Sequence, residues 1–326
     1  MTKLKSALIL VLVMITGAIF GQTYEDVVAK FNTGADHINK GEFTIAITHL
    51  QEVLAMAETI GSEADDLAGK SKTQIPLLNY QAAIGFMRQK DYENAIPYLE
   101  NTIDLANAYG NNAEYKDKAM KYLPQLLTGV GNQRINSDCE GAVELFESAV
   151  KYSPTYAKAH LGLGLCHKSN YNEEEMIESL TKAIELASAK NDAKTVVMAQ
   201  EGLSSYFVEM GKMELEDMDP AAEDFDYAVE AFERALEFHP ENSDANYQLS
   251  IINNRLAEYD LALKYGLKAL ESETVEVKIA AINYEIGNAY YNNAELDLAC
   301  EAFKKALVDV IEDIARAKME RIPGCE

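Results

Sequence analysis

The chain has 326 residues, of which 48% are hydrophobic and 25% charged, and it contains only seven prolines. This composition predicts a folded chain and excludes a disordered one. The formal net charge of −24 argues against nucleic acid or an anionic membrane as partners, because an acidic surface repels their phosphates. The charge is typical of a solvated surface, and it would also attract basic partners.

Residues 1–21 have the pattern of a secretory signal peptide. Lys3 and Lys5 precede an apolar run from Ala7 to Phe20, and Gly21 is the expected cleavage site. The apolar run is shorter than the roughly 20 residues that a membrane-spanning helix needs, and no later segment of the sequence reaches that length. We therefore expect an exported protein, periplasmic or secreted, whose mature part (22–326) has no integral membrane segment.

After the leader, a pair of amphipathic helices recurs along the chain. The clearest copy is 280–306, in which the small residues Gly287 and Ala299 and the large residues Tyr290 and Phe303 stand at fixed offsets. Small residues let two helices approach closely, and large ones fill the space beside them. Such a pair leaves a second face apolar, so it needs similar neighbours. Copies occur near 27–60, 76–109, 123–156, 157–190, 196–242, 243–276 and 280–313.

These offsets resemble those of the tetratricopeptide repeat (TPR) family, whose unit is about 34 residues of helix–turn–helix. The resemblance covers nearly all of the chain after residue 25. The chain departs from the family pattern at Met176 and Gly266, and it has no tryptophan. The resemblance implies an all-α fold, a TPR-type α-solenoid of about seven repeats. We expect about 14 to 17 helices and no sheet.

Three of the repeats carry extra residues. In two of them the extra residues precede Pro76 and Pro124, which predicts an added helix or a kinked extension of the first helix. In the fifth repeat we expect an acidic loop, 213–226, between the two helices. Its carboxylates could bind calcium, although their spacing does not match an EF-hand. The favoured interpretation is a solvated loop that caps a helix starting near Ala221.

The residues that follow the last repeat predict a capping helix at 308–322. Leu307, Val310, Ile311 and Ile314 recur at helical spacing, and charged residues lie between them. An exposed end of a solenoid needs such a cover to remain soluble. We therefore expect these four side chains to face the last repeat.

Four cysteines in an exported chain favour disulfide pairing. Cys139 opens the second helix of the third repeat and Cys166 lies near the end of the next helix. Adjacent helices in the stack run antiparallel, so these two ends should lie close together and a disulfide is predicted; the alternative is two buried thiols. Cys300 and Cys325 would be about 35 Å apart on a straight helix, so that pair would require the tail to fold back.

No catalytic or metal-binding motif is present. The sequence contains no HExxH, GxSxG, CxxC or glycine-rich phosphate loop. His160 and His167 are seven residues apart, whereas metal pairs on a helix are usually three or four apart. His37 and His167 occupy positions where other repeats have a large packing residue. We therefore expect no enzyme activity, no cofactor and no metal.

The resemblance implies that the first helices of successive repeats line a concave groove that binds protein or peptide. Tyrosine, asparagine and arginine suit this role, because rings supply contact area and amides bond to a peptide backbone. Some family members hold a C-terminal carboxylate with an Asn and Lys/Arg clamp, but this chain lacks most of those lysines. The groove residues predicted from the repeat register are Tyr80, Ile84, Met87, Arg88, Leu161, Leu165, Lys168, Tyr247, Ile251, Asn254, Arg255, Tyr284, Asn288, Tyr291 and Asn292.

The function expected from this sequence is that of a non-enzymatic scaffold or adaptor of the cell envelope, with a protein or peptide as its partner. The alternative is a helical-repeat receptor for a small molecule or a glycan. Receptors of that kind tend to have large loop inserts rich in tryptophan and asparagine, and this chain has one modest loop and no tryptophan.

Overall fold

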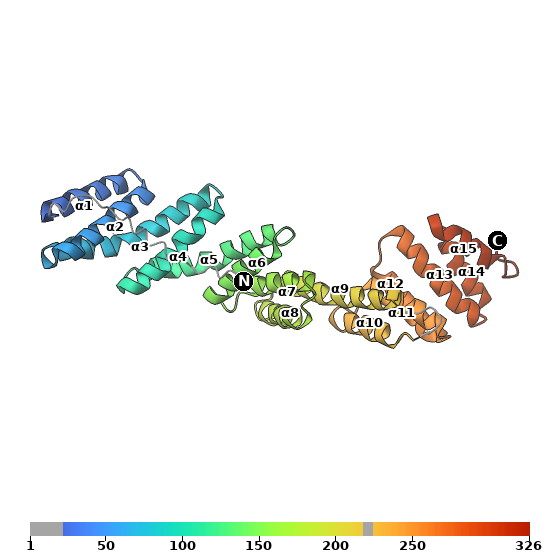
Figure 1. The fold of residues 1–326 in the computed structure, drawn as a ribbon. Coiled ribbons are helices and arrows are strands. Elements are labelled where there is room, and N and C mark those ends of the chain that lie inside the picture. Colours follow the sequence, from blue (N-terminus) through green and yellow to red (C-terminus); the bar gives the residue numbers. More distant parts are fainter. Residues whose placement is uncertain (1–21, 218–223) are drawn as a thin grey trace. The chain divides into compact units, whose positions relative to one another are not determined.

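A computed structural model describes residues 22–217 and 224–326, and within these ranges the chain forms fifteen α-helices, two short 3-10 helices and no strand (Figure 1). The all-α prediction is confirmed, and the helices follow one another as pairs. The predicted signal peptide, 1–21, lies outside the described residues. The α-helices are α1 (Tyr24–Asn39), α2 (Phe43–Ile60), α3 (Asp65–Arg88), α4 (Tyr92–Tyr109), α5 (Ala113–Arg134), α6 (Cys139–Tyr152), α7 (Ala157–Ser169), α8 (Glu173–Ser188), α9 (Ala193–Asp217), α10 (Asp226–Phe238), α11 (Ser243–Arg255), α12 (Tyr259–Ser272), α13 (Glu276–Asn292), α14 (Leu296–Lys305) and α15 (Glu312–Met319).

The chain divides into two compact units, Met1–Leu126 and Leu127–Glu326, and the division falls within α5. In the first unit, α1 packs against α2 and α3 against α4. In the second unit the pairs are α7 with α8, α9 with α10, α11 with α12, and α13 with α14. Each pair buries its apolar stripes against its partner and its neighbours, as expected for repeats that cannot form a core alone.

Close contact between paired helices depends on small residues facing large ones. The Phe303 ring lies against Gly287, where a Cβ atom would come 2.6 Å from the ring, and Phe232 lies in the same way against Gly211, at 2.8 Å. The Phe146 ring is enclosed between Gly131 of α5 and Gly162 of α7. A side chain at these glycines would displace a fully buried ring. The recurrent small residues of the sequence therefore leave the space that the aromatic rings of the paired helices fill.

In five of the described repeats, the turn between the two helices contains one residue in the left-handed region of backbone conformation. Gly41 supplies it in the first repeat, with φ of 76°. Lys90, Tyr171, Ala257 and Ala294 adopt the same conformation, with φ between 55° and 62°, although a side chain makes it less favourable by about 1 kcal/mol. The packing of the two helices on either side therefore determines the turn more strongly than the preference of the turn residue.

The extra residues of three repeats lengthen the first helix of each. α3, α5 and α9 have 24, 22 and 25 residues, and Pro76 and Pro124 lie inside α3 and α5. The sequence left open an added helix or an extended first helix, and the structure has the extended helix.

The acidic loop predicted at 213–226 begins inside a helix. α9 continues to Asp217, and residues 218–223, which include Ala221, lie outside the described residues. α10 begins at Asp226, with Phe225 as its N-cap residue and no side-chain cap. The predicted start of the loop, residue 213, was wrong, because α9 continues past it. Gly211 is the small residue that faces the Phe232 ring in this repeat. Most of the extra residues therefore lengthen α9 on its N-terminal side.

The predicted cap is present, but only some of the expected residues form it: Leu307 packs against the last repeat, whereas Val310 and Ile314 do not face it. A 3-10 turn, Asp309–Ile311, precedes α15 and breaks the helical period, so Val310 is 72% exposed and Ile314 is 45% exposed. The buried residues are Ala315, Met319 and Ile322. The tail folds back, and Cys325 pairs with Cys300, with their Cα atoms 5.6 Å apart.

The structure also pairs Cys139 with Cys166, with a Cα–Cα distance of 5.6 Å. Cys139 is the first residue of α6, and Cys166 lies in the last turn of α7. The pair belongs to a cluster that includes Ala142, Phe146 and Leu163. The bond therefore fastens two antiparallel helices at one end of their interface.

We expect the Cys139→Ser, Cys166→Ser variant to lose about 2–4 kcal/mol of unfolding free energy, because the bond closes a 27-residue interval of the unfolded chain. The unreduced, digested protein should give a mass-spectrometric peak for the linked peptides. Recovery of both peptides singly and alkylated would show that the bond is absent. The control is the Cys300→Ser, Cys325→Ser variant, denatured with and without reductant: it retains only the Cys139–Cys166 bond, so its reduction should reproduce the loss.

None of the helices within the described ranges is both long and apolar enough to cross a lipid bilayer.

Candidate binding face

The second unit presents a face formed by successive first helices. α7 contacts α9 and α11 contacts α13, while no comparable contact joins α8 to α10 or α12 to α14 among the described residues. Within these two sets, the first helices therefore lie closer together than the second helices do, and hydrogen bonds from Lys212 to Asp244 and from Asn242 to Ser204 link α9 to the start of α11. We call the surface formed by α7, α9, α11 and α13 the first-helix face.

The contact between α7 and α9 includes an ion pair. The Lys168 Nζ lies 3.0 Å from Glu209 Oε1 and donates a hydrogen bond of 2.8 Å to Ser205 Oγ. The Lys168 side chain is only 20% exposed, so the pair is partly shielded from solvent. Shielding makes a charge pair stronger than one on an open surface.

The contact between α11 and α13 places amides around a carboxylate. Asn254 Nδ2 donates to Glu285 Oε2 and to the Glu285 backbone carbonyl, at 2.9 Å each. Asn288 Nδ2 donates to the same Oε2 at 3.4 Å. The Oδ1 atoms of Asn254 and Asn288 are buried without a hydrogen-bond partner. A carboxylate and two unpartnered amide oxygens therefore lie together on this face.

Burial raises the pKa of the Glu285 carboxyl, and the hydrogen bonds from Asn254 and Asn288 and the charges of Lys318 and Arg255 offset this only in part. Burial also raises the pKa of Tyr247 to about 12, with a further contribution from the Glu285 charge. Both groups are partly buried, so the site has a lower effective dielectric than an open helix surface.

The predicted groove residues of the first unit all lie on α3. Tyr80, Ile84 and Met87 are partly buried and Arg88 is exposed. The Tyr80 ring lies 5.5 Å from that of Tyr115, and burial raises its pKa.

The predicted groove residues of the second unit lie on α7, α11 and α13. Leu161 does not belong to the surface: it is 7% exposed and lies in a core cluster with Met176 and Leu180 of α8 and with Ala199 of α9. Arg255 and Asn292 are exposed. The partly buried residues are Leu165, Lys168, Tyr247, Ile251, Asn254, Tyr284, Asn288 and Tyr291.

The repeat register did not predict that residues of α9, and one further residue of α13, belong to the first-helix face. Ser205, Glu209 and Lys212 of α9 lie on the face, and so does Glu285. Gly211 was the signal for α9, because it is the small residue opposite Phe232. The connection before α10 is longer than in the other repeats, so Gly211 does not stand at the offset from Phe232 that the repeat register predicts.

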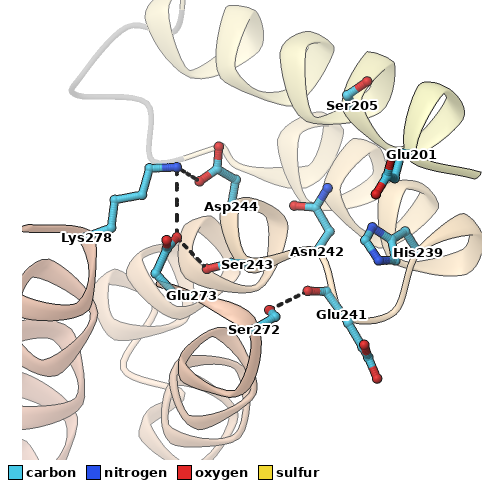
Figure 2. Close-up of a pocket in the computed structure, with 10 residues that line it drawn as sticks. All are labelled: Glu201, Ser205, His239, Glu241, Asn242, Ser243, Asp244, Ser272, Glu273 and Lys278. Carbon is cyan, nitrogen blue, oxygen red and sulfur yellow. Dashed lines mark hydrogen bonds and ion pairs between the residues drawn. The ribbon is translucent and has the colours of Figure 1, made fainter. Parts of the chain in front are cut away.

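A polar pocket of about 330 Å³ lies beside this face, at the start of α11 and α13 (Figure 2). Lys278 Nζ reaches Asp244 at 2.8 Å and Glu273 at 3.9 Å, and Ser243 donates to Glu273 at 3.0 Å. Lys212 of α9 also reaches Asp244, at 3.1 Å. The pocket therefore holds an internal charge network that ties α9, α11 and α13 together.

The two carboxylates of this network are held in their charged form. Burial alone would raise the pKa of Asp244, but hydrogen bonds from Lys278 and Lys212 hold it below the ordinary value. Burial would likewise raise the pKa of Glu273, and the backbone N–H groups of Val275 and Thr274 hold it low. Since their partners are already within the chain, these groups have less need of a ligand than Glu285.

Three of the five histidines make local contacts. His37 bonds to Glu42 at 2.6 Å and stacks on His49, and His160 bonds to the Pro154 carbonyl at 3.0 Å. Within the described part of the chain, no group of three His, Cys, Asp or Glu residues could hold a metal ion.

Family models described as tetratricopeptide repeat match residues 157–190, 221–274 and 280–307. No curated protein matches the chain. The C-terminal part of a TPR repeat-containing protein from Cytophaga hutchinsonii has a TM-score of 0.39 at 16% identity, over 87% of this chain and 98% of that one. The TPR2AB domain of yeast Sti1, in its complex with pHSP90, has a TM-score of 0.36 at 14% identity, over 91% and 97%.

The crystal structure of YrrB, a TPR protein with an unusual peptide-binding site, has a TM-score of 0.34 at 16% identity, over 60% of this chain and 91% of YrrB. Similarity at this level does not carry a ligand from one protein to another. The three matched segments contain the helix pair α7–α8, the three helices α10–α12, and the pair α13–α14 except for the first residues of α13. The chain therefore contains tetratricopeptide repeats over these segments.

Proposed function

We propose that the chain is a non-enzymatic scaffold or adaptor that binds a protein or peptide on the concave side formed by its first helices. The observation that carries this proposal is the first-helix face itself, where half-buried tyrosines and amides from α11 and α13 lie side by side. Tyr247 and Tyr284 offer ring area, and the amide oxygens of Asn254 and Asn288 lack partners. A bound polypeptide supplies apolar side chains and N–H donors together.

The proposed place of action is the cell envelope, in the periplasm or outside the cell. The signal-peptide pattern of 1–21 supports export, and the pairing of Cys139 with Cys166 and of Cys300 with Cys325 supports an oxidising compartment. In the envelope, an adaptor of this kind would hold a partner by its surface and leave the chemistry to other proteins.

The test is capture of a binding partner from an envelope extract, followed by measurement of its affinity for surface variants. Ile251→Arg with Asn288→Arg adds two bulky cations to the first-helix face. The matched control, Leu261→Arg with Leu267→Arg, adds the same charge to exposed positions of the second helix α12. We expect the first pair to weaken binding at least tenfold and the second pair to leave it unchanged.

Two outcomes would contradict the proposal. If both variant pairs weaken binding equally, the partner does not use the first-helix face. If the extract yields only a glycan or a metabolite, the chain is a small-molecule receptor instead. Circular dichroism of each variant verifies that the helices are intact, so that a loss of binding is not a loss of fold.

A further inference from the structure

The α7–α9 and α11–α13 contacts place equivalent residues opposite each other, and this equivalence extends the proposed function. Lys168 lies four residues after Gly164, and Asn254 lies four after Ser250, the residue at the corresponding offset of its repeat. Glu209 precedes Gly211 by two residues, as Glu285 precedes Gly287. Gly211 and Gly287 each face the phenylalanine of their own repeat. The Lys168–Glu209 and Asn254–Glu285 contacts are therefore the same contact in two repeats.

The two contacts differ in charge. Glu209 receives the ammonium group of Lys168 at 3.0 Å, whereas Glu285 receives only neutral amides. In the described part of the chain, no lysine or arginine nitrogen lies within the 4.0 Å ion-pair distance of Glu285. A cation that the fold supplies in one repeat is thus replaced by a neutral side chain in the other.

Two cations lie near Glu285, but each contacts an aromatic ring. The Arg255 guanidinium lies 5.9 Å from the Phe225 ring centroid, and the Lys318 ammonium lies 5.8 Å from that of Tyr291. Both are close enough to influence the Glu285 carboxyl without pairing with it. They border the site and leave the carboxylate without a cation.

The atoms around the carboxylate also lack donors. Asn254 Oδ1 and Asn288 Oδ1 are buried acceptors without partners, and leaving a buried acceptor without a hydrogen bond is unfavourable. The amide orientation is fixed, since each Nδ2 donates to a carboxylate, which only accepts. What the site lacks is therefore a positively charged group with several N–H donors. Lysine has three donors and arginine five.

We propose that Glu285, together with Asn254 and Asn288, anchors a lysine or arginine side chain of the bound polypeptide. This inference rests on the proposed function, and it specifies the chemistry of the partner. The incoming cation would take the position that Lys168 has opposite Glu209, and its hydrocarbon stem would lie along the Tyr247 ring. The net charge of −24 favours the approach of a basic segment.

The probe is a phage-displayed library of random dodecapeptides, selected on the immobilised protein. We expect the enriched peptides to share one lysine or arginine at a fixed position. A synthetic copy of an enriched peptide, measured by fluorescence anisotropy, should bind about ten to a hundred times more weakly when norleucine or citrulline replaces that residue. This range corresponds to the loss of a charge-assisted hydrogen bond.

Three protein variants separate this site from general electrostatic attraction. Glu285→Gln should give the same ten- to hundredfold loss and make the norleucine or citrulline replacement almost neutral, as a double-mutant cycle requires. Asn254→Lys should also abolish the basic preference, because it supplies the cation from within, as Lys168 does. Glu209→Gln is the matched control. It changes the net charge by the same amount at the equivalent position, and it should leave the preference intact.

The outcomes distinguish the two proposals. If peptides bind to the first-helix face without a basic preference, or if Glu209→Gln and Glu285→Gln weaken binding equally, the inference about Glu285 is wrong and the proposed function stands. If no peptide is enriched and no protein partner is captured, the proposed function fails and this inference fails with it. Lys318→Met should not weaken binding, and if it does, the anchor is not Glu285 alone.

Discussion

Phe232→Ala is expected to lower the free energy of unfolding by about 3–5 kcal/mol, the range found for removal of a buried aromatic side chain. The Phe232 ring is 0% exposed and belongs to the largest cluster of the second unit, with Leu203, Tyr206 and Phe207 of α9. Its removal leaves a cavity opposite Gly211, which has no side chain that could move to fill it. The surrounding helices can therefore compensate little.

The matched control is Tyr227→Ala on the same helix. Tyr227 is 73% exposed, so its removal should change stability by no more than about 0.5 kcal/mol. Both variants replace an aromatic residue of α10 by alanine, and any difference between them reports burial alone. Chemical denaturation followed by circular dichroism measures the two changes, and equal losses would show that α10 does not pack as described.

Hydrogen exchange adds a spatial test of the same variant. Repeats interact mainly with their nearest neighbours, so Phe232→Ala should increase amide exchange in α9, α10 and α11 more than in α1 and α2. Uniform acceleration along the chain would mean that the structure unfolds as a single cooperative unit.

The helix pairs could be predicted from the sequence because one physical requirement recurs in each of them. A small residue must face a large one wherever two helices cross, and the positions of Gly287 and Phe303 illustrate this without any structure. The same register located Asn254 and Asn288 on the first-helix face. These features depend on spacing within one repeat, which sequence alone records.

Features that depend on insertions or on the opposite helix could not be predicted. The offset search missed Gly211 because the connection to α10 is longer than in other repeats, and Glu209 and Lys212 were missed with it. Leu161 was predicted to lie on the surface, but it is buried in a cluster that includes Ala199 and Leu203 of α9. The importance of Glu285 depends on which residue the preceding repeat places opposite it, and that is a property of two repeats together.

Met319→Ala with Ile322→Ala is expected to lower the unfolding free energy by about 4 kcal/mol or more, since each buried aliphatic residue contributes about 2–5 kcal/mol. Both side chains are 5% exposed and pack with Ala299 and Phe303 of the last repeat. Their loss should expose the end of the core and reduce solubility as well as thermal stability. Deletion of 308–326 should have the same effect, with the loss of the Cys300–Cys325 bond in addition.

Val310→Ser with Ile314→Ser is the control that separates the observed cap from the one expected from sequence periodicity. A continuous helix would bury both residues against the last repeat, and their replacement would then destabilise the protein by several kcal/mol. The 3-10 turn at Asp309–Ile311 instead leaves them exposed, so the double variant should melt within a few degrees of the wild type and remain as soluble. A large loss from this pair, with little loss from Met319→Ala and Ile322→Ala, would show that the helical period continues through residue 309 and that the other face of the tail covers the core.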